Sequence, residues 1–355
     1  FVDGATGDEG GVSLLRNGKN GTLSTLIFKY ASHGLSHGHF DRLNYNLFDK
    51  GKEVISDYGS VRYIGVEQKY GGRYLKENDS YAGQTIAHNT LVVDEASHFN
   101  GNEKEAEKHH GKKLFSSLTK PSLQVVMAEE LNAYKDVAMK RSVYMIELPD
   151  GRKLVADLLH AIADKEHQYD LPFQYNGQLI SSSAKYTSNL KKQETLGKKN
   201  GYQFLWVEAE ASAKDTIAQL TFLQHRTFYS VSCLVDGEAQ LFYTRTGAND
   251  PNFNLRHEPA WIIRRKAVSP SYLNIIEIHG SMDPVTEFAT QSYSAVKGLK
   301  WIHNDLNYSI AEIMIQDKKL VIAQSNANFS STATHNQSGF NWVGTYTVWF
   351  DGKKL

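Results

Sequence analysis

The chain has 355 residues, of which 41% are hydrophobic, and its 39 basic side chains balance 39 acidic ones. That balance argues against a nucleic-acid-binding surface or a polybasic membrane patch, and no apolar run reaches membrane-spanning length. The length suffices for a large buried core, and the single cysteine, Cys233, excludes an internal disulfide.

Alternating strand-like runs, separated by turn residues, dominate the chain. In chain order, the predicted strands cover residues 22–30, 43–48, 53–57, 142–148, 153–159, 229–235, 310–315, 320–324 and 345–350. The clearest helix candidate is short, residues 104–109, and the Lys-rich stretches 97–120 and 183–200 are predicted to be surface loops. Because the strands follow one another without long intervening helices, we expect an all-β fold, a large antiparallel multi-sheet β-sandwich with few short helices.

Histidine and aspartate residues are concentrated around the first predicted hairpin. His37 and His39 enter it, Asp57 closes it, and His88 opens a later apolar strand. Positions i and i+2 of an extended chain face the same side, so both early histidines could serve one site. Imidazole and carboxylate groups are ordinary Zn²⁺ ligands. The sequence therefore predicts a zinc site at His39, Asp57 and His88, although each histidine could instead be a packed or hydrogen-bonding residue.

A loop-like stretch, residues 60–81, joins Asp57 to His88 and carries Arg62 and Tyr74. Arginine offers a planar fork that suits a carboxylate, and tyrosine can transfer a proton. The stretch could bind an acidic sugar, or its tyrosines could pack while its arginines form surface ion pairs. Residues 244–259 form a second polar stretch, which is either a binding loop or a long sheet connection.

Several of these runs resemble the C-terminal β-domain of heparinase II/III-like polysaccharide lyases. The resemblance rests on SHGHFDRLNYNLFDKGKEVISDYG, the Arg/Tyr loop, QTIAHNTLVVDEASHF, KHH at 108–110 and GANDPNFNLRHEP. Within that superfamily the chain is most similar to the alginate lyases of polysaccharide lyase family 17, the oligoalginate lyases. The likeness covers nearly the whole chain, so residues 1–355 are expected to form one β-sandwich domain of this type.

The resemblance implies β-elimination at a uronic acid of alginate. A base removes the C5 proton while donors or cations neutralise the C5 carboxylate, and the 4-O-glycosidic bond breaks. Family members act mostly from chain ends and release unsaturated uronate. The resemblance further implies that the three metal candidates hold a zinc ion that supports the site, that Arg62 meets the substrate carboxylate, and that Tyr74 and His37 serve catalysis.

The family also contains a helical (α/α) toroid, N-terminal to the sheets, that supplies an Asn-His pair and the principal catalytic tyrosine. Residues 1–355 show no long helical hairpins, so the toroid is expected to be a partner domain outside this chain. The chain alone is then expected to be inactive or nearly so. The chain starts at Phe1 without Met or a signal peptide, so it is expected to be the mature or trimmed part of something longer, from which an export signal could have been removed. The family implies a periplasmic or secreted protein, and a homodimer stays open.

Three other functions remain open from the sequence. One is a glycosaminoglycan lyase domain of the same superfamily, acting on heparin or heparan sulfate. Another is a non-catalytic carbohydrate-binding or structural β-sandwich, which the absence of bound metal would favour. The third, a cupin-like metalloenzyme, needs a single barrel with an open redox-capable metal, and the mixed hairpins do not favour it.

Overall fold

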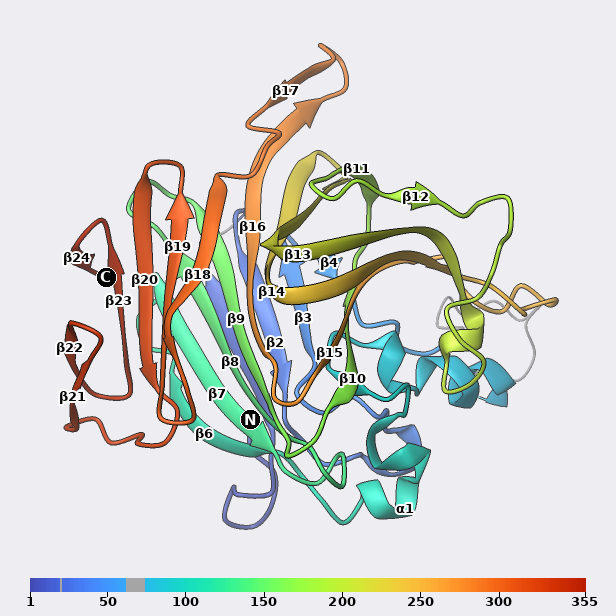
Figure 1. Ribbon diagram of the computed structural model, residues 1–355, viewed down its shortest axis with the longest axis horizontal. Coiled ribbons are helices and arrows are strands. Elements are labelled where there is room, and N and C mark those ends of the chain that lie inside the picture. The colour runs from blue at the N-terminus through green and yellow to red at the C-terminus, as the bar shows by residue number, and fades with distance from the viewer. Residues whose placement is uncertain (20, 62–73) are drawn as a thin grey trace.

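The computed structural model describes residues 1–19, 21–61 and 74–355, and antiparallel strands dominate it (Figure 1). The first sheet has the spatial order β1 (Val12–Asn17), β2 (Ser24–Lys29), β3 (Tyr45–Asp49) and β4 (Lys52–Ile55). The second and largest sheet follows the order β5 (Val92–Val93), β10 (His167–Gln174), β15 (Pro259–Ala267), β14 (Thr227–Thr246), β16 (Ser271–Asp283), β9 (Lys153–Ile162), β8 (Ala138–Glu147), β7 (Leu123–Glu130) and β6 (Lys112–Ser117). Four further strands join this sheet: β13 (Leu205–Gln224) beside β14, β11 (Gln178–Ser182) and β12 (Thr187–Ser188) beside β13, and β17 (Phe288–Thr290) beside β16.

The C-terminal part of the chain forms a separate sheet and a hairpin. The sheet has the order β18 (Val296–Asn304), β19 (Tyr308–Ile315), β20 (Lys318–Ser325), β23 (Tyr346–Phe350) and β24 (Lys353–Lys354), and the hairpin pairs β21 (Thr334–Gln337) with β22 (Phe340–Val343). The helical segments of the described residues are single turns: 3-10 turns at Leu35–His37, Thr85–Ala87, His98–Gly101 and Tyr202–Phe204, a π-helical turn at Asn78–Ala82, and α1 (Glu103–Ala106).

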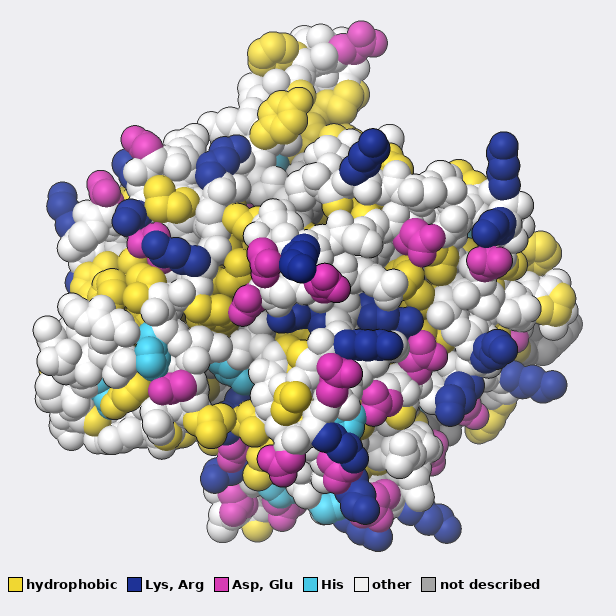
Figure 2. Space-filling model, in the orientation of Figure 1, with side chains coloured by type: hydrophobic (Ala, Val, Ile, Leu, Met, Phe, Trp, Pro, Cys, Tyr) yellow, Lys and Arg dark blue, Asp and Glu magenta, His cyan; other side chains and the backbone are white. Residues whose placement is uncertain are grey.

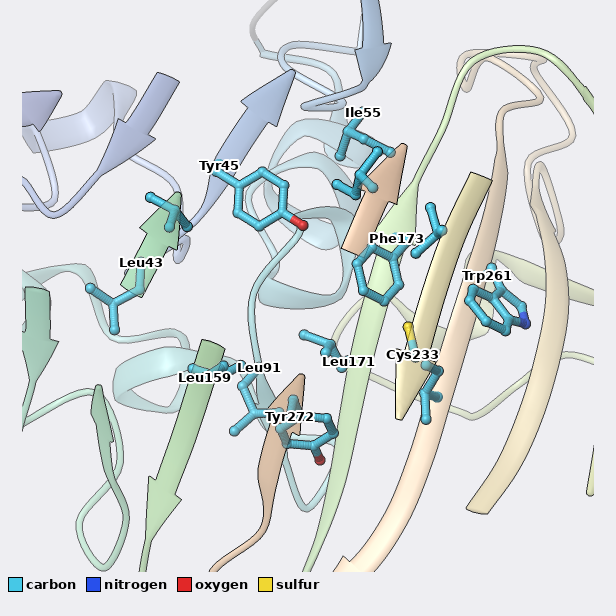
Figure 3. Packing of buried hydrophobic residues seen from close by; sticks show 14 of the residues in the cluster. Leu43, Tyr45, Ile55, Leu91, Leu159, Leu171, Phe173, Cys233, Trp261 and Tyr272 are labelled. Carbon is cyan, nitrogen blue, oxygen red and sulfur yellow. The ribbon is translucent and has the colours of Figure 1, made fainter. Parts of the chain in front are cut away.

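The sheets stack in layers with the largest sheet in the middle. On β8, Val143 and Met145 belong to the core shared with the first sheet, while Tyr144 and Ile146 belong to the core shared with the C-terminal sheet. Because both faces of this strand are covered, its residues 143–146 are all apolar and do not alternate with polar ones. Figure 3 shows the first core, where Leu43 and Tyr45 lie among side chains of the largest sheet. Each large apolar side chain buried there contributes about 1.5–3 kcal/mol.

A third core lies beneath the short helical turns. Tyr58, Tyr81 and Ile86 pack with Phe242 and Ile262 at the β14–β15 part of the largest sheet. In Figure 1 the helical turns gather on one side of the molecule, and the connection between β14 and β15 extends to that same side. This core therefore seats the irregular segments that carry the histidine and aspartate candidates.

The predicted all-β sandwich is confirmed, and so are its hairpins. The predicted strands 43–48 and 53–57 correspond to β3 and β4, and the predicted strands 142–148 and 153–159 correspond to β8 and β9. The surface-loop prediction for residues 97–120 is wrong in part, because β6 pairs with β7 there. The predicted helix at 104–109 is shorter than expected and ends at Ala106.

The visible face of the molecule mixes both signs of charge. Lys and Arg side chains lie among Asp and Glu side chains in Figure 2, in keeping with the balanced composition. A hairpin formed by β16 and β17 projects from the body (Figure 1). None of the helices in the described part of the chain has the length and apolarity needed to cross a membrane.

Candidate metal centre

Three separate segments bring His39, Asp57 and His88 together. His39 lies in the loop between the 3-10 turn at residues 35–37 and β3, Asp57 lies two residues beyond β4, and His88 follows the 3-10 turn at residues 85–87. One ligand atom from each residue lies within 4.8 Å of the ligand atoms of the other two. The centroids of the two imidazole rings are 5.1 Å apart. The structure thus groups the three residues nominated from the sequence as metal ligands.

The chain reaches His39 by a tight turn and not by a strand, so the expectation that His37 and His39 share one face of a strand is wrong. Leu35 has a φ of 58°, and a 3-10 turn covers Leu35–His37. Gly38 then passes so close to His33 that a Cβ would lie 1.9 Å from the His33 carbonyl oxygen. His37 is exposed as a result, whereas His39 is partly buried. The strand predicted to open at His88 also begins later, at Val92.

Hydrogen bonds to both carboxylate oxygens fix the Asp57 side chain. The Asn44 Nδ2 donates to Asp57 Oδ2 at 2.9 Å, and the Gly59 backbone N–H donates to Asp57 Oδ1 at 2.9 Å. Asn44 also accepts, at 2.9 Å, a hydrogen bond from the backbone N–H of Asn89, the residue after His88. The Asn44 side chain therefore links the segments of two candidate ligands, as outer partners of metal ligands do.

Asn89 fixes the backbone next to His88. It is fully buried, and its Nδ2 donates to the carbonyls of Tyr45 and Ser56 at 3.0 and 2.8 Å. Its Oδ1 accepts from the backbone N–H of Gln174 at 2.7 Å, and its carbonyl accepts from Arg141 Nη1 at 2.6 Å. The segment that carries the candidate ligand His88 is thereby hydrogen-bonded to both the first sheet and the largest sheet.

The surroundings of His88 fit a bound cation. The residue is fully buried, and neither ring nitrogen has a hydrogen-bond partner among the described residues. Nδ1 lies 3.2 Å from Asp57 Oδ1, but outside hydrogen-bonding geometry. A buried polar group without a hydrogen-bond partner costs about 1–3 kcal/mol. Within the described part of the chain, the two ring nitrogens of His88 therefore lack a partner that a bound cation could supply. Two imidazoles and one carboxylate around a common point match a zinc donor set with a fourth position open.

The pKa shifts favour metal binding at His39 and Asp57 but not at His88. Burial, with His88 adding to it, lowers the pKa of His39 to about 4, so its ring is neutral at pH 7. Burial alone would raise the pKa of Asp57, but the His88 charge and hydrogen bonds hold that pKa well below its usual range. Burial would lower the pKa of His88, yet Asp57 outweighs it and raises this pKa. The raised pKa of His88 opposes metal binding, because a cation must displace any proton on that ring.

The other predicted site residues are placed less completely. Arg62 lies outside the described residues. Tyr74 is the first described residue after that gap, and 85% of its surface is exposed. His37 is exposed at the C-terminal end of its 3-10 turn. The structure therefore does not show these three side chains meeting at one point.

Sequence reasoning missed Asn44 and Asn89 as supports of the centre. Both lie inside the runs that carried the resemblance, LNYN and AHNT, but no role was assigned to either. The available signal was an asparagine next to apolar residues, as Asn44 is, or beside a candidate ligand, as Asn89 is. Such a residue is buried only if its amide is hydrogen-bonded.

The sequence of the chain is similar to a known family and to named proteins. The family model described as "Heparinase II/III-like, C-terminal" matches residues 2–284. An exo-oligoalginate lyase of Saccharophagus degradans is 38% identical over 355 residues, which cover 98% of this chain and 48% of that protein. An alginate lyase of Stenotrophomonas maltophilia is 39% identical over 300 residues, which cover 83% of this chain and 40% of that protein.

Among solved structures, the heparan sulfate lyase HepC from Pedobacter heparinus superposes with a TM-score of 0.56 and 15% sequence identity. The match covers 93% of this chain and 43% of that one. At this identity the likeness concerns the fold alone. The chain spans about half the length of the curated relatives that it matches.

Proposed function

Because the chain belongs to the heparinase II/III-like, C-terminal family, we propose that it is the sheet domain of an alginate lyase. The enzyme would cleave alginate oligosaccharides by β-elimination from chain ends and release unsaturated uronate. The observation that carries this proposal is the 38% identity to an exo-oligoalginate lyase along almost the entire chain. The cluster of His39, Asp57 and His88 supports it by providing a built centre on the irregular side of the fold.

In this proposal the three ligands would hold Zn²⁺, and the ion would cross-link three segments of the site. Only ligands that stay fixed relative to one another can hold a cation tightly, and the Asn44 and Asn89 hydrogen bonds meet that need. The ion's role is support, and the residues beside it are proposed to act on the sugar.

The chemistry requires the substrate carboxylate to be neutralised as the C5 proton leaves. Arg62 is proposed to meet that carboxylate with its guanidinium fork. Tyr74 and His37 are proposed to contact the reacting sugar and to handle protons there. The exposure of His37 and Tyr74 supports a role in contacting a ligand that arrives from outside this domain.

A second domain is part of the proposal. The chain covers 48% and 40% of two relatives, which leaves room in such proteins for the helical toroid expected from the sequence. We propose a periplasmic or secreted location, because an acidic polysaccharide is met outside the cytoplasm.

The test compares substrates on the proposed two-domain protein, in which the toroid precedes this chain. Poly-mannuronate, poly-guluronate and heparan sulfate are assayed by the ultraviolet absorbance of the new C4–C5 double bond. Cleavage of an alginate polymer and not of heparan sulfate supports the proposal, whereas the reverse would assign a glycosaminoglycan lyase. Arg62→Ala in the same protein is expected to remove most turnover with the fold intact, and undiminished cleavage would contradict the role of Arg62.

A further inference from the structure

The connection between β14 and β15, residues 247–258, contacts the chain immediately beyond the metal ligand Asp57. Its Arg256 packs on Tyr58, which is 1% exposed. The backbone N–H of Arg256 donates to the Tyr58 hydroxyl at 2.6 Å, and the guanidinium carbon lies 4.1 Å from the centroid of the Tyr58 ring. The sequence left open whether this stretch binds ligand or only joins two strands. The contact gives it a third role, as a support.

The guanidinium of Arg256 binds several carbonyl groups in one short stretch. Nη2 donates to the carbonyl of Tyr58, and Nη1 donates to the carbonyl of Ser60 at 2.9 Å and approaches that of Val61 at 3.5 Å. Nε pairs with Glu258. Arginine carries five donors in a rigid planar fork, so one side chain can serve all these acceptors at once.

This stretch in turn sets the position of the Asp57 carboxylate. The Gly59 backbone N–H donates to Asp57 Oδ1 at 2.9 Å. Gly59 has a φ of +63°, a left-handed conformation that turns the N–H back toward the carboxylate. Glycine readily leaves this conformation unless its neighbours are held. Arg256 holds the carbonyls on both sides of Gly59, at Tyr58 and Ser60.

The same connection also contacts the chain on the far side of Tyr74. Asn254 Nδ2 donates to Glu77 Oε2 at 3.0 Å. The next residue, Asn78, accepts a hydrogen bond from the Val61 backbone N–H on its Oδ1 at 2.9 Å. Residues 254–256 are therefore attached to both flanks of the segment that begins after Val61 and ends before Tyr74.

We propose that Arg256 is a positioning residue of the metal centre. It holds the backbone of residues 58–61 so that Asp57 presents its carboxylate to the ion bound with His39 and His88. This inference rests on the metal site of the proposed function. It adds a requirement that neither the ligands nor their sequence spacing reveal, because Arg256 lies almost 200 residues further along the chain.

The experiment measures zinc affinity of the chain by competition with a colour-forming chelator, and the melting temperature beside it. Arg256→Ala is expected to weaken zinc binding about tenfold, the lower end of the effect of losing an outer partner of a metal ligand. Arg256→Lys is expected to restore only part of this loss, because an ammonium keeps the charge but not the fork. The matched control is Arg245→Ala, which removes an arginine that pairs with Glu208 and donates to the His257 carbonyl at the base of the same connection.

The outcomes separate the two ideas. The Arg245→Ala control is expected to bind zinc within about twofold of wild type. Two results would overturn the role of Arg256 while leaving the metal site in place. One is equal zinc affinity in Arg256→Ala and wild type, and the other is an equal loss of affinity in Arg256→Ala and Arg245→Ala. A wild-type chain that binds no zinc would overturn the metal site and the inference together. If Arg256→Ala does not fold, Tyr58→Phe removes one anchor of Arg256 and is expected to weaken zinc binding severalfold; unchanged affinity in that variant also counts against the proposal.

Discussion

Arg141 joins the largest sheet to the segment that carries the candidate ligand His88, so its loss is expected to weaken the fold and the candidate site together. Its Nε and Nη2 donate to the two carboxylate oxygens of Asp157 at 2.7 Å each, and both side chains are fully buried. Its Nη1 donates to the carbonyls of Leu43 and Asn89 at 2.8 and 2.6 Å. Arg141→Met leaves the Asp157 charge buried without its counter-ion. Breaking a buried pair in this way costs about 3–5 kcal/mol.

The expected shift in melting temperature follows from the chain length. An unfolding entropy of about 2.1 cal/mol/K per residue gives about 0.75 kcal/mol/K for the chain of 355 residues. A loss of about 4 kcal/mol therefore lowers the melting temperature by about 5 °C in scanning calorimetry. Zinc affinity is expected to fall as well, because the carbonyl of Asn89 adjoins His88.

Two further variants test whether the lost stability comes from the buried ion pair. Arg152→Met removes an arginine on the hairpin turn before β9, whose pairing with Asp150 at 3.5 Å is partly exposed, and is expected to melt within about 1 °C of wild type. The double variant Arg141→Met with Asp157→Leu removes both buried charges and is expected to recover part of the lost stability. A single Arg141→Met variant that melts like wild type would refute the argument.

Three other results are expected. His88→Ala should lower bound zinc from about one ion per chain to near none by atomic emission, with unchanged circular dichroism; retained zinc would place the metal elsewhere. Burial and the nearby Arg42 lower the pKa of His98 to about 3. The neutral ring therefore contributes fully to the free energy of unfolding above the unfolded-state pKa of about 6.5. That contribution is lost as the pH falls, by about 2 kcal/mol at pH 5. Urea titrations should show a smaller loss between pH 7 and pH 5 in His98→Gln, and an equal loss would contradict this assignment. Gly38→Ala, whose Cβ would lie 1.9 Å from the His33 carbonyl oxygen, should displace the His39 loop and weaken zinc binding, and unaltered zinc affinity would show that the loop can yield.

The sheets were predictable because local patterns specify hairpins. The runs on either side of residues 149–152 pair as β8 and β9 in the expected antiparallel sense. The layering was not predictable in detail, because the pattern within one strand does not say which sheet covers each face. Val143 and Tyr144 are equally buried yet belong to different cores.

Residue type was enough to predict the candidate ligands. The backbone conformation that leads to them could not be predicted from the sequence. His37 and His39 were assigned to a strand because of their spacing, but the left-handed Leu35 and the close approach of Gly38 to His33 impose a turn. The outer contacts were beyond sequence reasoning for another reason. Arg256 meets Tyr58 only because the third core brings two distant segments together.

The order of these residues along the chain has a consequence for biosynthesis. All three candidate ligands have been made by residue 88, whereas the arginine proposed to position Asp57 is residue 256. At about 5–20 residues per second, a growing polypeptide would wait about 8–34 s between the two events. A nascent chain would thus expose the candidate ligands well before it could bind the ion tightly. A ribosome-bound fragment ending before residue 244 is expected to release zinc to a chelator more readily than the complete chain of 355 residues.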